Sequence, residues 1–365
     1  MKRPLRLAHF GTGHTGMLVL RQILQQPELE LVGHLVHSPA KVGVDSGTIA
    51  GIGPVGVRAT DSFDEFCNLD ADCVTYFATE FGRDATDVID QMCRILESGK
   101  NVVTTTFVRL VYPWSLPADV LIRLEKACST GQSAFFGTGI APGFTTDALP
   151  LQCATLSASP RVVRISERVL QGTYSDPLSF TALGFGSAPT GDDTDVAADA
   201  WVEHFAGTLQ MLADGFGWQL DSIRAKKDTW LADTDYEFAA GKIPSGTVAA
   251  VRLRFDGIVA GEPRLQLSWV YSMPDDPGDP WEPAQPVSSC VRRFTRIEID
   301  GDPRVGLTLE LTGGDLPGAD ATATRAVNAI AAVCQAPTGV HSALDLVISP
   351  SGVTIPATSH QGATR

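Results

Sequence analysis

A glycine-rich turn near the N-terminus is the part of the sequence whose residue types and spacing most clearly indicate chemistry. Residues 11–16 read Gly-Thr-Gly-His-Thr-Gly and directly follow the apolar segment 5–10. In this G-x-G-x-x-G pattern the first glycine permits a tight turn, and the second lets backbone N–H groups approach a pyrophosphate. The third lets the following helix pack on the strand. The cofactor-binding residues predicted in this turn are Gly11, Thr12, Gly13, His14, Thr15 and Gly16.

The elements that must position this turn alternate regularly through the first half of the chain. Short apolar segments typical of buried strands alternate with amphipathic segments typical of helices. This alternation predicts an α/β fold, a doubly wound parallel sheet of the Rossmann type, whose ligands bind outside the carboxyl ends of the strands. The predicted strands are 5–10, 29–36, 57–60, 73–78, 101–106 and 133–138, and the predicted helices are 17–26, 62–66, 83–98 and 118–130.

The pattern changes after about residue 150. Segments 161–171, 247–258, 264–273, 291–298 and 304–311 read as strands of a mostly antiparallel sheet, so we predict a second, α+β domain. A Pro- and Asp-rich segment, 274–286, is expected to form a loop that serves as a lid or an interface arm. The predicted organisation is a Rossmann domain, a substrate and dimerisation domain, a C-terminal helix returning to the Rossmann domain, and a tail, at 1–145, 146–320, 321–348 and 349–365.

Polar residues follow several of the predicted strands, at the edge where a ligand would bind. His37, Ser38 and Lys41 follow the second strand, where an acidic residue would favour NAD and a cation or small hydroxyl favours NADP. We therefore predict a 2′-phosphate pocket and a preference for NADP, with NAD as the alternative. Further along the same edge, Ala78, Thr79 and Thr104 are predicted to contact the cofactor, and Thr106 to face the nicotinamide or the substrate.

Composition narrows the class of protein. The chain has 365 residues, of which 44% are hydrophobic and 19% charged, with a formal net charge of −14. A strongly acidic balance argues against nucleic acid and anionic membranes as partners. No segment resembles a signal peptide or a membrane span. Seven cysteines without a C-x-x-C pair fit reduced thiols and a cytoplasmic location, and no cluster has the spacing of metal ligands, so we expect no metal.

Four segments carry a resemblance to a known family. They are 11–16, then 37–47 with 54–60, then Gly-Thr-Gly-Ile-Ala-Pro-Gly-Phe at 137–144, and finally 326–330 with 336–339. In this order they resemble the dihydrodipicolinate-reductase-like oxidoreductases that include 2,4-diaminopentanoate dehydrogenase and the native amine dehydrogenases. The resemblance implies a nicotinamide cofactor, a homodimer, and reduction of an imine or oxidation of an amine. It also implies that the Asn328 amide lies near the nicotinamide carboxamide.

One departure from that family concerns the amine. Its amine dehydrogenases carry a glutamate shortly after the strand corresponding to 101–106, before a Tyr-Pro pair. Here Tyr112 and Pro113 are present, but residues 104–111 contain no carboxylate. A cationic ammonium in an apolar pocket is costly unless it is paired, so we expect small free alkylamines to be poor substrates. Glu80, Asp147 and Glu167 are alternative acids that the sequence does not rank.

The proton donor and the reaction therefore stay open at this stage. Besides Thr106, we predict Tyr112 and Tyr174 as catalytic residues, while Trp230, Tyr271 and His204 are candidates for the substrate wall or for the donor. The predicted function is an NAD(P)-dependent oxidoreductase acting on a C=N or CH–NH bond of a small or medium organic molecule. The alternatives are a C=O reductase in the same pocket and a nucleotide-binding protein without catalytic activity.

Overall fold

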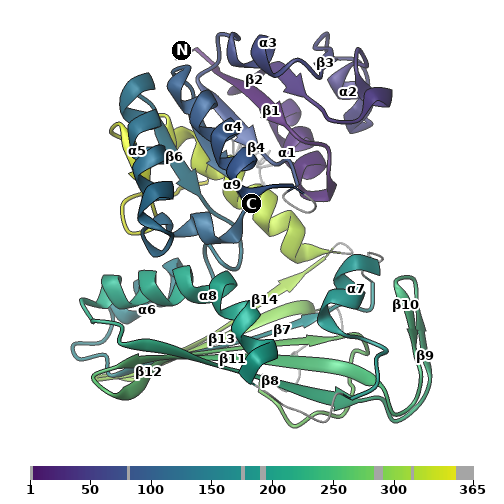
Figure 1. Cartoon of the computed structure of the whole chain (residues 1–365), viewed down its shortest axis with the longest axis vertical. Helices are drawn as coiled ribbons and strands as arrows, with labels where there is room; N and C mark the ends of the chain where they lie inside the picture. The colour runs from purple at the N-terminus through teal and green to yellow at the C-terminus, as the bar shows by residue number, and fades with distance from the viewer. Residues whose placement is uncertain are drawn as a thin grey trace, which may run out of the picture.

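The structure is a computed structural model that describes residues 3–79, 83–173, 177–189, 195–282, 291–313 and 316–350. Figure 1 shows two bodies stacked along the long axis, with the N-terminal body above a broad sheet. The predicted Tyr174 and Glu80 lie outside the described residues.

The N-terminal body contains a seven-stranded sheet in the order β15-β6-β5-β4-β1-β2-β3, and every neighbouring pair is parallel. This confirms the predicted Rossmann-type sheet. The glycine turn follows the carboxyl end of β1, an internal strand that pairs with β4 on one side and β2 on the other. The strands are β1 (Leu5–Phe10), β2 (Leu29–Leu35), β3 (Ala59–Thr60), β4 (Cys73–Tyr76), β5 (Asn101–Thr104), β6 (Ala134–Gly137) and β15 (Gly339–His341).

Helices cover both faces of this sheet, because its strands are apolar on both sides. On one face Phe66, Met92 and Leu124 pack with Val102 and Phe135, and on the other Ile23 and Ile330 pack with Val103 and Phe136. The first face carries α3 (Phe63–Cys67), α4 (Ala85–Glu97) and α5 (Ala118–Gly131), and the second carries α1 (His14–Gln25), α2 (Ser46–Ala50) and α9 (Pro317–Val333). Ser62 caps α3 by accepting a hydrogen bond from the Glu65 N–H.

The second body contains a six-stranded sheet in the order β14-β13-β7-β12-β11-β8. Only the pair β7 and β12 is parallel among its neighbours, so the sheet is mostly antiparallel, as predicted. The strands are β7 (Val162–Leu170), β8 (Ser222–Leu231), β11 (Val248–Val259), β12 (Glu262–Ser272), β13 (Val291–Asp300) and β14 (Val305–Thr312), and a separate hairpin is formed by β9 (Tyr236–Phe238) and β10 (Gly241–Ile243).

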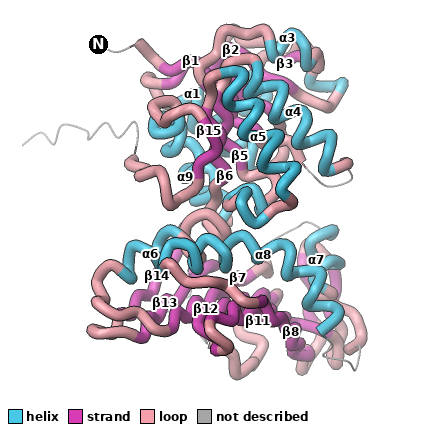
Figure 2. The backbone as a smooth tube through the Cα atoms, turned by 60° about the vertical axis from the view of Figure 1, so that its left-hand side comes forward, coloured by secondary structure: helices cyan, strands magenta, loops and turns pink. Residues whose placement is uncertain are grey.

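Helices cover one face of the second sheet. Figure 2 shows α6 (Ala148–Ala154), α7 (Pro177–Leu183) and α8 (Asp195–Phe216) along the side that faces the Rossmann body. Phe205 and Leu209 of α8 pack here on Phe255 and Trp269 of the sheet, and the ring centroids of Phe205 and Trp269 are 4.6 Å apart.

The Pro- and Asp-rich segment lies against the opposite face of this sheet. Arg168 of β7 donates hydrogen bonds of 2.7 and 2.6 Å to the two carboxylate oxygens of Asp279, and both side chains are about 1% exposed. The Trp281 ring lies 4.8 Å from the Arg252 guanidinium. Residues 274–282 are therefore an arm fixed to the sheet, on the face away from the helices.

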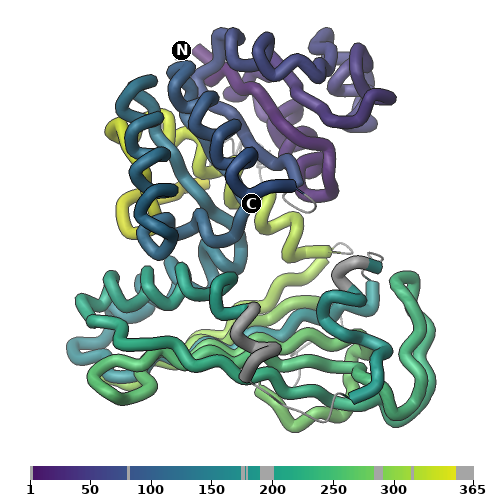
Figure 3. Tube along the Cα trace, in the orientation of Figure 1, coloured from purple at the N-terminus to yellow at the C-terminus, as the bar shows by residue number. Residues whose placement is uncertain are grey.

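The C-terminal part of the chain returns from the second body to the first. Helix α9 begins at Pro317, four residues before the start of the predicted C-terminal segment 321–348, and packs against α1 and β5. Strand β15 then joins the Rossmann sheet beside β6. Figure 3 shows this C-terminal stretch in yellow running alongside α5.

Candidate active site

The glycine turn has the geometry that a pyrophosphate cradle requires. Gly11 has φ +119°, and a Cβ there would lie 2.5 Å from the Phe77 carbonyl oxygen, so only glycine fits the turn. Gly13 is different, because a Cβ there would meet nothing within 4 Å. Gly13 is also the N-cap of α1, a helix end with no side-chain cap and no acidic residue in its first turn. The space in front of Gly13 and the exposed N–H groups of the helix fit a dinucleotide phosphate.

Two buried histidines lie beneath this turn. His9 Nε2 is 2.8 Å from the Gly11 carbonyl oxygen and His9 Nδ1 is 2.8 Å from Thr75 Oγ1. The His34 ring lies 5.4 Å from the His9 ring, and His34 Nδ1 is 3.1 Å from Ser46 Oγ. Burial lowers the pKa of His9 to about 3 and that of His34 to about 4, so both rings are neutral at pH 7.

The structure brings together the residues predicted to contact the ribose side of the cofactor. Lys41 Nζ donates a hydrogen bond of 2.7 Å to Thr12 Oγ1, which joins the end of β2 to the glycine turn. Ser38 precedes the short 3₁₀ turn Pro39–Lys41. The exposed His37 ring lies 5.0 Å from Phe10, and burial, followed by the charge of Arg83, lowers the pKa of its imidazole.

The predicted residues at the ends of β4 and β5 also lie side by side. Thr104 donates a hydrogen bond of 2.8 Å to the Tyr76 carbonyl, and Thr106 donates one of 2.9 Å to the Ala78 carbonyl. Thr79 follows as an exposed residue. Because the Thr106 hydroxyl proton is directed at the backbone, this hydroxyl presents an acceptor rather than a donor to the binding edge.

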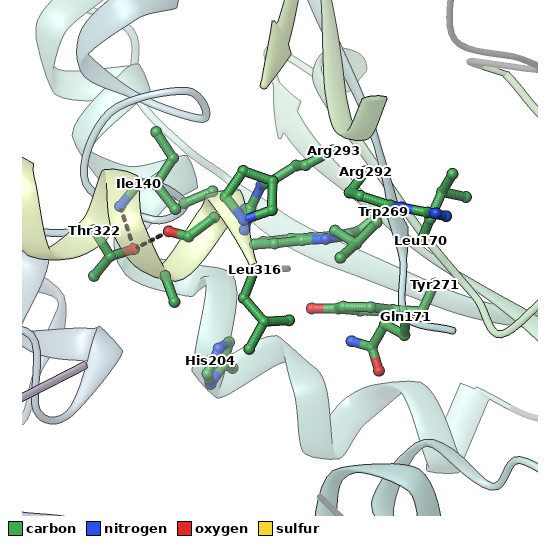
Figure 4. Close-up of a pocket in the computed structure, with 15 residues that line it drawn as sticks. Ile140, Leu170, Gln171, His204, Trp269, Tyr271, Arg292, Arg293, Leu316 and Thr322 are labelled. Carbon is green, nitrogen blue, oxygen red and sulfur yellow. Dashed lines mark hydrogen bonds between the residues drawn. The ribbon is translucent and has the colours of Figure 1, made fainter. Parts of the chain in front are cut away.

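A cavity of about 250 Å³ lies beside this edge, between the two bodies. Figure 4 shows that its walls come from the loop after β6, helix α8, the second sheet and the N-terminus of α9. The Thr322 hydroxyl of α9 accepts a hydrogen bond of 3.3 Å from the Ile140 N–H, which fixes one wall. The polar residues that line it are Gln171, His204, Tyr271, Arg292, Arg293 and Thr322.

Two arginines supply the positive charge of this cavity. The Arg293 guanidinium pairs with the carboxylate of Glu167, which is fully buried and accepts hydrogen bonds from Thr145 at 3.0 Å and Thr295 at 3.1 Å. The buried Arg293 Nε has no hydrogen-bond partner in the described part of the chain. Arg292 pairs at 2.5 Å with the exposed Asp275. Neither arginine was predicted from the sequence, although Arg293 occupies an inward position of β13 in line with Ile297.

The predicted catalytic Tyr112 is not brought to this cavity. Its hydroxyl donates a hydrogen bond to Asp214 of α8, and burial followed by Asp214 raises the pKa of the phenol. Tyr112 therefore joins the Rossmann body to α8. Asn328 lies within α9, six residues beyond Thr322 and so nearly two helical turns away from that cavity residue. Trp230 donates its indole N–H to the Pro277 carbonyl on the arm.

Of the alternative carboxylates, the two in the described part of the chain, Asp147 and Glu167, do not line the cavity. Glu167 is covered by Arg293, as described above. Asp147 is fully buried and caps α6, where it accepts hydrogen bonds of 2.7 Å from the N–H groups of Gly143 and Ala148. Burial raises the pKa of Asp147. Within the described ranges, residues 104–111 present no acid, and no group of three or more potential ligands is arranged to hold a metal.

Comparison with known proteins identifies the family. The chain is 30% identical over 349 residues to an amine dehydrogenase of Streptomyces virginiae, and the match covers 94% of this chain and 96% of that protein. The chain belongs to the amine dehydrogenase family. Residues 184–358 also match the family described as the 2,4-diaminopentanoate dehydrogenase C-terminal domain. A 2,4-diaminopentanoate dehydrogenase of Acetoanaerobium sticklandii is 24% identical, over 76% of this chain and 74% of that protein. The resemblance inferred from the four sequence segments is confirmed.

Solved structures show the same fold. An amine dehydrogenase from Mycobacterium smegmatis superposes with a TM-score of 0.73 at 21% identity, covering 94% of this chain and 96% of that one. A probable dehydrogenase from Thermotoga maritima has a TM-score of 0.57 at 14% identity, covering 93% and 92%. No helix among the described residues is long and apolar enough to cross a membrane.

The two first glycines of the turn are expected to respond differently to substitution. Gly13→Val places its side chain in the open space before the helix, where it blocks a pyrophosphate without meeting protein atoms. We expect calorimetric titration with NADPH and NADH to show no binding to this variant, with an unchanged melting temperature. Gly11→Ala is the contrasting variant, because its Cβ meets the Phe77 backbone and lowers stability. Wild-type affinity in Gly13→Val would remove the turn from the cofactor site.

Proposed function

We propose that this protein is an NAD(P)-dependent oxidoreductase that moves a hydride to or from the carbon of a C=N or CH–NH bond in a small or medium organic substrate. The observation that carries this proposal is the polar cavity at the carboxyl edge of the Rossmann sheet in a chain of the amine dehydrogenase family. When bound, the nicotinamide supplies or accepts the hydride. The protein's own residues position the cofactor, enclose the substrate and exchange a proton.

For the cofactor, we propose that Gly11, Gly13 and the N-terminus of α1 hold the pyrophosphate. Lys41, Thr12 and Ser38 face the ribose, and their cationic and hydroxyl groups favour the 2′-phosphate of NADP. Thr104, Thr106 and Ala78 form the edge beside the nicotinamide. We further propose a cytoplasmic homodimer, as the family resemblance implies, with small molecules as its only other partners. Sedimentation velocity at micromolar concentration tests the dimer.

Ser38→Asp tests the cofactor preference. A carboxylate at this position repels a 2′-phosphate and can accept hydrogen bonds from ribose hydroxyls, so we expect the preference to shift toward NADH. A charge-assisted contact contributes about 1.5–3 kcal/mol, which corresponds to about one to two decades in the ratio of dissociation constants. Ser129→Asp, on the exposed surface of α5, is the matched control. A wild type that already binds NADH more tightly contradicts the proposed preference.

The charges of the cavity indicate which substrates it accepts. Arg293 is held by Glu167, and its buried Nε–H has no partner among the described residues. Arg292 pairs with Asp275, which is exposed and can be displaced by a ligand. The N-terminus of α9 carries no side-chain cap and lines the same cavity. Guanidinium groups and a helix N-terminus bind carboxylates. We therefore propose that substrates with an anionic group are preferred over simple alkylamines.

A matched pair of carbonyl compounds tests both parts of the proposal. The protein is incubated with NADPH and either 4-oxopentanoate or its methyl ester, with and without ammonium, and absorbance at the reduced-cofactor band is followed. We expect NADPH oxidation that depends on ammonium and that is faster with 4-oxopentanoate than with its methyl ester. Ammonium-independent oxidation favours the C=O reductase alternative, which the acid-free segment 104–111 supports. Tight cofactor binding without turnover favours a non-catalytic nucleotide-binding protein.

A further inference from the structure

The chemistry of an amine requires a proton acceptor that residues 104–111 do not provide. An amine is an ammonium ion at neutral pH, and it must lose one proton before its lone pair can form a C=N bond. Three of the other candidates that the structure describes are also engaged elsewhere. The Tyr112 hydroxyl is directed at Asp214, Thr106 donates to the Ala78 carbonyl, and Glu167 is covered by Arg293.

Among the described residues that line the cavity, only four side chains are ionisable: His204, Tyr271, Arg292 and Arg293. The two guanidinium groups remain protonated and cannot exchange a proton. The choice is therefore between an imidazole and a phenol. An imidazole ordinarily titrates near neutral pH and a phenol near pH 10, so only the imidazole offers a base without further activation.

His204 is placed by α8 with its ring fixed but its nitrogens uncommitted. The ring packs edge-on against Trp201, with centroids 5.8 Å apart, and against Phe205, with centroids 4.8 Å apart. It makes no hydrogen bond to another residue in the part of the chain that the structure describes. Figure 4 shows His204 beneath Leu316, with Arg292 and Arg293 on the other side of the view. The aromatic contacts hold the ring, while its nitrogens are left for a ligand in the cavity.

Burial, and after it a neighbouring positive charge, keep this imidazole neutral. Arg109, whose guanidinium pairs at 2.5 Å with Glu203, lies near it on the Rossmann side, and Arg292 and Arg293 line the cavity with Tyr271. Burial, followed by the positive charge of Arg109, lowers the pKa of His204 to about 4. The ring is therefore neutral at physiological pH and able to accept a proton. A substrate carboxylate near the arginines would favour the transient imidazolium.

We propose that His204 is the acid–base residue of this enzyme and takes the role of the glutamate that the family resemblance leads one to expect within residues 104–111. In amine oxidation one N–H bond of the substrate ammonium breaks and one N–H bond forms on the imidazole. The nitrogen lone pair then forms the C=N bond as the hydride leaves carbon for the oxidised cofactor. In the reverse direction the imidazolium returns the proton. This assignment rests on the proposed function.

Substitution of His204 in the full-length protein tests the assignment. His204→Asn keeps a hydrogen-bonding group but cannot take up a proton, and we expect kcat/KM for ammonium-dependent reduction of 4-oxopentanoate to fall by about 10²- to 10⁴-fold. Cofactor affinity and melting temperature are expected to stay unchanged. Gln210→Ala, six residues further along α8, controls for changes to the helix, because its hydrogen bond to Asp214 lies at an exposed site. Tyr271→Phe removes the competing phenol.

Two further measurements separate a proton-transfer role from a structural one. In His204→Ala we expect added imidazoles to restore activity, with rescue increasing with their basicity. In the wild type with labelled histidine, the NMR resonance missing from His204→Asn is expected to shift when an amine ligand is added. Full activity of His204→Asn in an active wild-type background overturns the assignment alone, as does a larger loss in Tyr271→Phe. A wild type without ammonium-dependent turnover overturns the proposed function instead.

Discussion

Asp279→Ala is expected to lower the free energy of unfolding by about 3–5 kcal/mol, because it leaves a buried guanidinium without its counter-ion. Arg168 is about 1% exposed, and its two hydrogen bonds to Asp279 are joined by one of 3.0 Å to the Trp281 carbonyl. The arm at 274–282 cannot rearrange to provide another acid without losing the packing of Trp281 on Arg252. The loss is measured from urea unfolding midpoints with the slope fitted freely.

Two variants control for this experiment. Asp276→Ala changes an exposed acid on the same arm and is expected to cost less than about 1 kcal/mol. The double variant Arg168→Met with Asp279→Leu removes both charges, and we expect it to recover most of the lost stability, because apolar residues of similar volume replace buried ion pairs well. A double variant as unstable as Asp279→Ala would show that the arm is held by something other than charge.

The parts of the molecule that the sequence predicted are those determined by local patterns. The glycine turn needs only a strand, three glycines at fixed spacing and a helix, all of which begin within the first sixteen residues. The amino-acid sequence alone is therefore enough to place Gly11 and Gly13 at the turn. A position for Lys41 near the cofactor edge could be predicted for the same reason. Lys41 follows β2 closely in sequence, and this strand brings it to Thr12.

The substrate cavity could not be predicted in this way, because it depends on contacts between distant segments. Arg293 meets Glu167 only because β13 and β7 pair antiparallel in one particular register, with Thr295 opposite Glu167. Likewise Tyr112 follows a strand end, which made a catalytic role reasonable, but Asp214 of α8 takes its hydroxyl. The signal for this cavity in the sequence was a charged residue, Arg293, at a strand position that faces inward.

The structure also shows how residues 104–111, which contain no carboxylate, are packed. Phe107 has φ +56° and lines a small apolar cavity between α4 and α5, with Ile89 and Leu116 among its neighbours. A glutamate introduced at Phe107 would therefore enter the hydrophobic core of the Rossmann body rather than the substrate cavity. Because Phe107 packs in this apolar cavity, the absence of an acid from residues 104–111 leaves no empty space in the substrate cavity.

Acidification is expected to destabilise the protein through the two histidines beneath the glycine turn. The pKa of His9 is lowered to about 3 and that of His34 to about 4 by burial, whereas both titrate near 6.5 in the unfolded chain. Below pH 6.5 the unfolded state binds more protons than the folded state, so stability falls as the pH falls toward these lowered values. Each histidine contributes a loss of about 2 kcal/mol between pH 7.5 and pH 5.

Urea unfolding at pH 7.5, 6.5, 5.5 and 5.0 measures this loss. In His34→Gln the pH dependence is expected to be shallower by the contribution of one histidine, since the amide does not titrate and can still bond the Ser46 hydroxyl. The exposed His14, replaced by Gln, is the matched substitution. Because His9 supports the Gly11 carbonyl, cofactor affinity should also fall at the pH where the pair takes up its first proton. An equal loss on acidification in wild type and His34→Gln would show that other groups account for the acid lability.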